Sequence, residues 1–326
     1  MYDAGMRISA ILALVTLAAG PASAQVHHFE KTLQAEGVVT LDVRTERGGI
    51  SVVAGSPGQV IVGGTARVRI AWAVPEDADA LARATAAAPP ITRNGSTLVL
   101  TPPVDPRARD AVTLGYEVRV PPATTVIVRT DSGAVSVAGI TRNVSVESGS
   151  GSIAMRDLGA DLQVTSGSGA VSADGVGGSV RAKTDSGMLK FERVGASFTA
   201  ATGSGAVSAT FTGPGDVDVR TSSSGVRLDG VDGGLRVETG SGHVRVSGRP
   251  ERPWQITTSS SAIDLAFAPG TAAALDIASR SGGVRVEGLQ VTGTVDKRRV
   301  AGTLGAGGPT VQARSGSGSI RLKGPS

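Results

Sequence analysis

The chain has 326 residues, of which 40% are hydrophobic and 46 are glycine. This composition supports a buried core with many tight turns and excludes a largely disordered protein. The absence of cysteine excludes disulfides, thiolate metal sites and cysteine nucleophiles, and a net charge of +4 is too small for a dedicated nucleic-acid-binding protein.

The N-terminal segment has the layout of a secretory signal peptide. Arg7 precedes an apolar run over residues 8–19, and the small residues 22–24 follow it. The run is too short to span a bilayer as a helix, and no later stretch is long and apolar enough to do so. We therefore predict a signal peptide over residues 1–24 and an exported protein of the periplasm, cell envelope or extracellular space. An uncleaved anchor is the alternative, and the sequence leaves the start at Met1 or Met6 open.

Cleavage after Ala24 would place His27 third in the mature chain, followed by His28. A free amine with a histidine at the third position can bind Cu(II) or Ni(II) in a square plane of nitrogens. A histidine in a terminal tail is more often solvated. The sequence leaves metal binding by this pair open, and we predict no cofactor.

Residues 25–125 are predicted to form a capping β region. Residues 41–52 match one unit of the repeat that follows. Residues 60–71 have the pattern of a strand pair, 75–88 that of a short alanine-rich helix, and 96–101 and 116–120 that of strands. Because an exposed sheet edge invites aggregation, we expect this region to cover one end of the repeats.

Residues 126–326 are organised by a repeating Ser-Gly step. Its glycine recurs at 133, 151, 169, 187 and 205, always 18 residues apart, and then at 225, 242, 282 and 318. On both sides of each step, apolar and polar residues alternate, as in a strand with one buried face. An irregular insert at 290–309 is expected to add a hairpin near the far end.

Equivalent inward positions are apolar in every unit, and they are followed by a column of small hydroxyl residues. That column contains Thr130, Ser148, Ser166, Thr184, Thr202, Thr221, Thr239, Thr258, Ser279 and Ser315. We expect these hydroxyls to be buried beside the glycine corner and to bond a backbone group there.

Like-on-like columns predict an all-β fold, a parallel β-solenoid (β-helix) with about ten coils of ~18 residues and one short helix in the N-terminal capping region. In such a stack each coil buries its apolar side against its neighbours. A meander of antiparallel hairpins is the competing fold, since it shows the same alternation. It has no need for matched identities across the units.

The units resemble a known family. The closing segment, residues 302–320, together with the Ser-Gly units and the early strand-helix-strand region, is similar to a bacterial putative-adhesin family of β-strand repeats. The resemblance implies a right-handed β-helix-like fold and an envelope or surface location. It supplies no catalytic residues.

Catalytic motifs are missing from the sequence. No serine has glycine at both −2 and +2, no phosphate-binding loop with lysine occurs, and the outward columns do not bring acids together as polysaccharide hydrolysis requires. We therefore predict no enzyme activity, no catalytic residues and no metal or cofactor site.

One outward column is basic, and we interpret it as a possible stripe for anionic envelope or extracellular polymers. The stripe contains Lys190, Arg227, Arg245, Arg285 and Arg321. A solvated face that keeps the protein soluble is the alternative.

These observations predict an exported non-enzymatic β-solenoid that acts as an adhesin or as a structural or interaction protein of the envelope. A β-helix that binds or acts on polysaccharide is the second hypothesis. The sequence leaves the ligand and the oligomeric state open.

Overall fold

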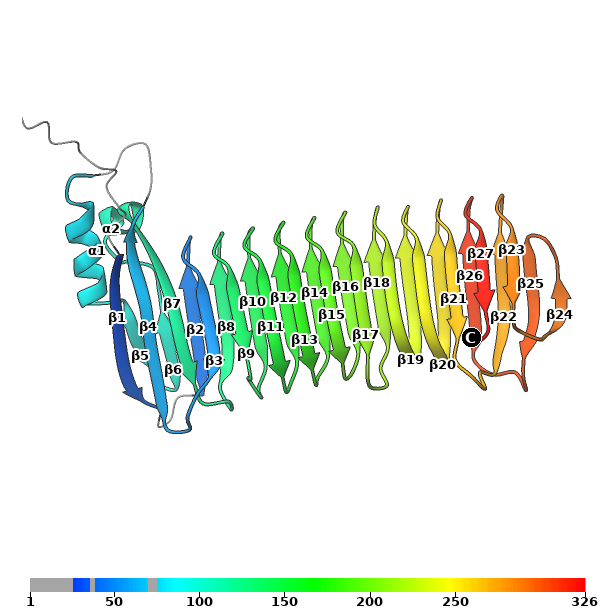
Figure 1. Ribbon diagram of the computed structural model, residues 1–326, viewed down its shortest axis with the longest axis horizontal. Coiled ribbons are helices and arrows are strands. Elements are labelled where there is room, and N and C mark those ends of the chain that lie inside the picture. Colours follow the sequence, from blue (N-terminus) through cyan, green and yellow to red (C-terminus); the bar gives the residue numbers. More distant parts are fainter. Residues whose placement is uncertain (1–25, 36–38, 70–74, 326) are drawn as a thin grey trace, which may run out of the picture.

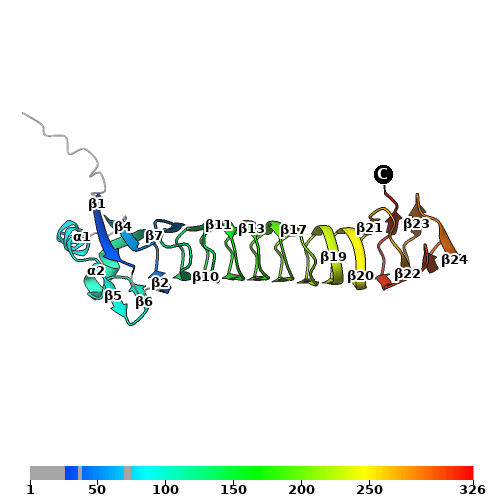
Figure 2. The same cartoon turned by 90° about the horizontal axis from the view of Figure 1, so that it is seen from below.

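The computed structural model describes residues 26–35, 39–69 and 75–325. The predicted signal peptide lies outside these residues. The described chain forms a long, flat rod in which two β-sheets face each other (Figures 1 and 2). All-β architecture with parallel stacking along the rod is therefore confirmed.

Each coil of the rod body contributes one strand to each sheet. The first sheet contains β8 (Thr125–Thr130), β10 (Val144–Ser148), β12 (Leu162–Ser166), β14 (Val180–Thr184), β16 (Phe198–Thr202) and β18 (Val217–Thr221). The second contains β9 (Val135–Ala138), β11 (Ile153–Leu158), β13 (Val171–Val176), β15 (Leu189–Val194) and β17 (Val207–Phe211). The long strands β19 (Val226–Thr239) and β20 (Val244–Thr258) run from the second sheet into the first.

The body strands pair in parallel and in matched register. Val144 lies beside Val126 and Leu162, for example, one coil away on either side. Every inward apolar residue predicted from the repeat is buried except Val286, which is half-buried in the last coil. The predicted stacking is thus confirmed through the body of the rod, and the competing hairpin meander is excluded there.

The hydroxyl column is buried, as predicted, at the corner between the two sheets. In several coils the hydroxyl accepts a hydrogen bond from the corner glycine three residues later, as in Gly187 N–H to Thr184 Oγ1 at 2.9 Å. The corner glycines lie directly on one another. A Cβ on Gly187 would stand 2.1 Å from the carbonyl oxygen of Gly169, so no larger residue fits.

At the N-terminal end, the chain departs from sequential stacking. The coil of β2 (Thr40–Thr45) and β3 (Ile50–Ala54) pairs with β8 and β9 in the register predicted for residues 41–52. Its other side pairs with β6 (Thr97–Leu100) and β7 (Val112–Val120), which come later in the sequence. The first repeat-like coil is therefore enclosed by later strands.

Antiparallel strands and two helices close this end. β4 (Gln59–Val68) joins β7 to β1 (Val26–Gln34), and β5 (Ile91–Asn94) pairs with β6. The helix α1 (Ala78–Ala87) lies across the end of the rod, next to the shorter α2 (Pro106–Ala111) (Figure 1). The predicted cap and α1 are confirmed. The expected strand pair at 60–71 is wrong, because β4 continues unbroken to Val68, and α2 was not expected.

At the C-terminal end, the last coil of the sequence is not the last coil of the rod. β26 (Thr310–Ser315) and β27 (Ile320–Lys323) lie between the coil of β20 and β21 (Ile263–Phe267) and the coil of β22 (Ala273–Ser279) and β23 (Val284–Glu287). The expectation that each coil packs on its sequence neighbours is therefore wrong at this end. The insert forms the predicted hairpin, β24 (Val291–Val295) with β25 (Arg299–Leu304), and β25 extends the first sheet from β22.

Candidate interaction faces

The basic stripe lies on the outer face of the second sheet. Register places one outward residue of each coil in a single row, which we call the basic row. Along the rod it runs Lys190, Ser208, Arg227, Arg245, Asp264, Arg321 and Arg285. Because β27 is inserted before β23, Arg321 precedes Arg285 along the rod. Asp264 interrupts the row after Arg245.

Acidic side chains flank most of the basic row. Lys190 Nζ lies 2.9 Å from Glu192 Oε1, and Arg227 Nε lies 2.7 Å from Asp229 Oδ2. Arg245 and Arg321 lie within 3.7 Å of carboxylates of Asp264 and Glu287, respectively. Arg285 has no ion-pair partner within the described residues. The five basic residues of the row and their four acidic neighbours, Glu192, Asp229, Asp264 and Glu287, together have a formal charge of +1.

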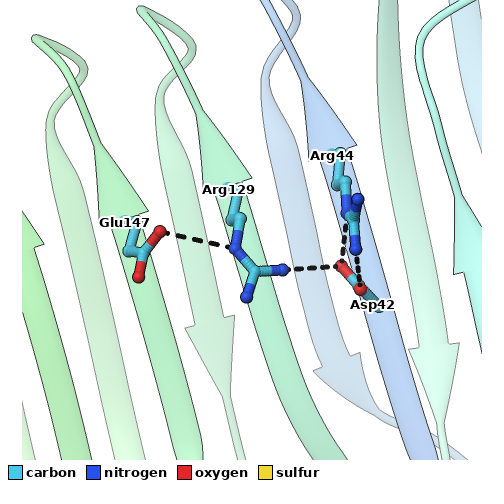
Figure 3. Close-up of polar contacts among 4 residues, drawn as sticks. All are labelled: Asp42, Arg44, Arg129 and Glu147. Carbon is cyan, nitrogen blue, oxygen red and sulfur yellow. Dashed lines mark hydrogen bonds and ion pairs between the residues drawn. The ribbon is translucent and has the colours of Figure 1, made fainter.

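The outer face of the first sheet carries a charge ladder across its N-terminal coils (Figure 3). Asp42, which is only 8% exposed, accepts hydrogen bonds from Arg44 at 2.7 and 3.2 Å and from Arg129 at 3.3 Å. Arg129 also lies 3.4 Å from Glu147 on the next coil. The hydrogen bonds with Asp42 raise the pKa of Arg44. The whole ladder connects β2, β8 and β10.

Arginine partners hold outer-face carboxylates in the ionised form. The hydrogen bond from Arg193 lowers the pKa of Asp174, and the hydrogen bond from Arg314 lowers the pKa of Asp276. A general acid needs a raised pKa at neutral pH, whereas these carboxylates are stabilised as anions. Their chemistry is that of ion pairing between coils.

A groove lies where the cap meets the second sheet. It has a volume of about 560 Å³ and is lined by small residues and backbone, among them Ser51 and Ser136, with Arg47, Arg67 and Glu117 at its sides. The Ser136 hydroxyl donates to Ser51 Oγ at 3.0 Å. The lining offers both donors and acceptors to a polar ligand.

Two of the three histidines have carboxylate partners. His27, on β1, lies 2.7 Å from Asp79 of α1, and this contact lowers the pKa of Asp79. His243 is an exposed residue just after the corner glycine Gly242 and lies 2.9 Å from Asp264. In the part of the chain that the structure describes, no three histidine or acidic residues gather as a metal site, and no helix is long and apolar enough to cross a membrane.

The acidic partners of the basic row were missed in the sequence interpretation. A simple signal marks two of them, since Glu192 and Asp229 stand two residues after their bases on the same strand face. The pairing of Arg321 with Glu287 depends on the inserted coil, and sequence spacing carries no sign of it.

Comparison with solved structures finds distant similarities. Three solved structures align over most of their length: a putative cell adhesion protein from Clostridium sporogenes (7% identity, 92% of this chain and 100% of that one, TM-score 0.22), and putative adhesins from Parabacteroides merdae (11%, 91% and 96%, 0.29) and Bacteroides fragilis (12%, 91% and 97%, 0.30). Comparison with curated proteins gives no significant match.

The family model described as Toastrack DUF4097 matches residues 23–215 and again residues 177–323. The two matches overlap within the repeats and together span nearly all of the described chain, which confirms the family of β-strand repeats expected from the Ser-Gly units. The chain therefore belongs to the Toastrack DUF4097 family.

Proposed function

We propose that this protein is an exported, non-enzymatic β-solenoid that serves as an adhesin or as a structural scaffold of the cell envelope. The observation that carries the proposal is the continuity of the two outer faces, whose side chains are mostly polar or charged and recur at the coil spacing of roughly 4.8 Å. Such faces suit a partner that makes many repeated contacts along the rod.

The chemistry of the outer carboxylates supports a role without catalysis. Asp174 and Asp276 are held as anions by arginines on neighbouring coils. Hydrolysis of a polysaccharide needs one carboxylate that stays protonated beside a second that does not. Interlocked ion pairs on adjacent coils serve instead to hold a charged face in a fixed arrangement.

Labelling of intact cells tests the location that this function requires. Lys183 and Lys190 stand on the outer faces of the first and second sheets, respectively, and are exposed. An amine-reactive reagent that does not cross membranes should modify both in intact cells, as mapped by mass spectrometry of peptides. Modification only after the outer membrane or envelope is opened would contradict a surface role and leave a periplasmic scaffold.

The basic row is our proposed contact for anionic envelope polymers. Arg227 and Arg245 are direct neighbours across two coils, and Arg285 has no ion-pair partner among the described residues. With a net charge of only +1 for the row and its acids, binding should be weak and strongly dependent on salt.

Charge reversal tests this contact. Arg227→Glu with Arg245→Glu should weaken binding to purified lipopolysaccharide at low salt at least tenfold, about 1.4 kcal/mol. Arg220→Glu with Arg236→Glu, on the outer face of the opposite sheet, is the matched control and should retain binding. Equal binding by all three proteins would contradict the proposal.

The groove beside the cap supports a second candidate, recognition of a polysaccharide. Its serines and its charged sides offer the mixed donors and acceptors that sugar hydroxyls require. Under this alternative, Arg67→Ala should reduce glycan binding while reversal of Arg227 and Arg245 should not. The opposite pattern favours the basic row.

A further inference from the structure

Among the residues that the structure describes, four strands lie at the edges of the two sheets, each with a strand partner on one side only. They are β1 and β5 at the cap and β23 and β24 at the far end. Unpaired edges template association, and proteins usually protect them with charge or proline. β1 contains Glu30 and Lys31, β5 contains Arg93, and β23 contains Arg285 and Glu287. β24 reads Val-Thr-Gly-Thr-Val and contains neither a charge nor a proline.

The free edge of β24 presents regularly spaced backbone groups. Asp296 N–H donates to the Arg299 carbonyl at 2.7 Å in the hairpin turn. Because hydrogen-bonded and non-hydrogen-bonded pairs alternate in an antiparallel ladder, Thr292 and Thr294 bond to β25. Val291, Gly293 and Val295 therefore direct their N–H and C=O groups away from β25, toward the open edge. Residues 292–295 are all exposed.

The sequence of this edge is a palindrome centred on Gly293. When two copies pair antiparallel about a two-fold axis at that residue, Val291 meets Val295 of the partner subunit, Thr292 meets Thr294 of the partner subunit, and the two glycines face each other. The outward backbone groups fall on hydrogen-bonded pairs in this register. Every direct pair therefore joins like with like, without a charge clash.

We propose that β24 is a self-association edge through which a second copy of this chain extends the first sheet, giving an end-to-end dimer joined at its C-terminal ends. The inner side of the edge supports the second copy as the occupant. Val291 and Val295 share a face with their β25 partners Leu304 and Val300, which are buried in the core. Val295 itself is 53% exposed, and the proposed pairing places it against Val291 of the partner subunit.

Charge also permits this pairing. The antiparallel arrangement sets the two hairpin turns, each with Asp296, Lys297 and Arg298, at opposite ends of the paired strands, so that the charged turns of the two copies do not meet. Side-by-side association of the rods would bring long mixed-charge faces together instead. The inference does not depend on the proposed envelope function.

Sedimentation and small-angle scattering of the purified chain test the dimer. Across a micromolar concentration series, we expect a monomer–dimer equilibrium in which the maximum dimension of the dimer is nearly twice that of the monomer. If the chain stays monomeric at every concentration, the proposal is overturned. This holds even if β24 binds a strand of a different protein. A dimer without added length overturns it as well.

Paired variants at the exposed threonines test the register. Thr292→Lys with Thr294→Lys sets two lysine–lysine pairs across the axis and should abolish the dimer. Thr292→Lys with Thr294→Glu sets lysine against glutamate at the same two positions and should retain it. Both variants should melt like the unsubstituted chain, because these side chains are exposed. The register is wrong if both variants dimerise or if neither does.

Discussion

The body of the rod and its two ends are built from similar strands but close in different ways. From β10 to β18 each coil rests on the coils before and after it in the sequence, in unbroken register. At each end, one coil lies between two other coils. The enclosed coil is β2–β3 near the N-terminus and β26–β27 near the C-terminus.

This difference shows how a solenoid can protect its ends. A terminal coil contacts only one neighbour and frays, because solenoid stability is a sum of nearest-neighbour contacts. Here the coils β2–β3 and β26–β27 have two neighbours each, and antiparallel strands lie beyond them at both ends of the rod. The last repeat-like coil of the sequence, β26–β27, is thereby held within the stack.

Removal of residues 310–326 is expected to have the largest effect on the molecule. The inward residues Val311, Ala313, Ile320 and Leu322 are all completely buried, so their loss would open the core between β20–β21 and β22–β23. We expect hydrogen exchange to show loss of protection throughout β20 to β25. Truncation after Lys323 is the control and should leave protection unchanged. Unchanged protection of β20 to β25 in the truncated chain would indicate a simple terminal coil.

Substitution of one corner glycine should test the regular body. Gly187→Ala places a methyl group against the Gly169 carbonyl, and we expect it to lower the free energy of unfolding by about 3 kcal/mol. Ser186→Ala, one residue away and exposed, should change it by less than about 0.5 kcal/mol. Chemical denaturation measures both. Similar values for the two variants would show that the corners do not stack closely.

The smallest expected effect is a pH-dependent one at the inserted coil. Asp276 on β22 accepts hydrogen bonds from Arg314 and Gln312 on β26, and Arg314 lowers its pKa. A carboxyl group whose pKa is lowered in the folded state stabilises the fold at pH values above its ordinary pKa of 3.8. This contribution disappears as the pH falls through the lowered pKa.

We therefore expect Asp276→Asn to cost about 1 kcal/mol at neutral pH and nothing in strong acid. Asp232→Asn changes an exposed residue with no ion-pair partner in the described chain and is the control. It should leave the free energy of unfolding unchanged both at neutral pH and in strong acid. A cost for Asp276→Asn that is independent of pH would mean that the arginine contact is not its source.

Repeat spacing made the body of the rod predictable from sequence. A residue such as Val164 has an apolar equivalent 18 residues away on either side, and that identity fixes both the face and the register of its strand. The basic row followed from the same alignment. Its neutralising acids were missed because the outward columns were examined one at a time, although Glu192 and Asp229 lie on the same strands as their bases.

The ends were less predictable because their pairings join distant segments of similar sequence. Val311 fits the core beside Trp254 or beside Leu275 equally well by pattern, and the chain places it between them. The extended strand β4 departs from the expected strand pair for a related reason. It pairs along its length with β1 and β7, and local pattern does not record partners from outside the segment.

Engineered cross-links test the out-of-order coil most directly, because the chain has no cysteine of its own. Gln255 and Gln312 are register partners on adjacent strands, and Gln312 separates Gln255 from Asp276. Adjacent strands lie about 4.8 Å apart, within reach of a disulfide, whereas two strand spacings exceed it. Gln255→Cys with Gln312→Cys should cross-link rapidly under mild oxidation, and Gln255→Cys with Asp276→Cys should not. Rapid cross-linking of the second pair alone would show coils stacked in chain order and contradict this account of the ends.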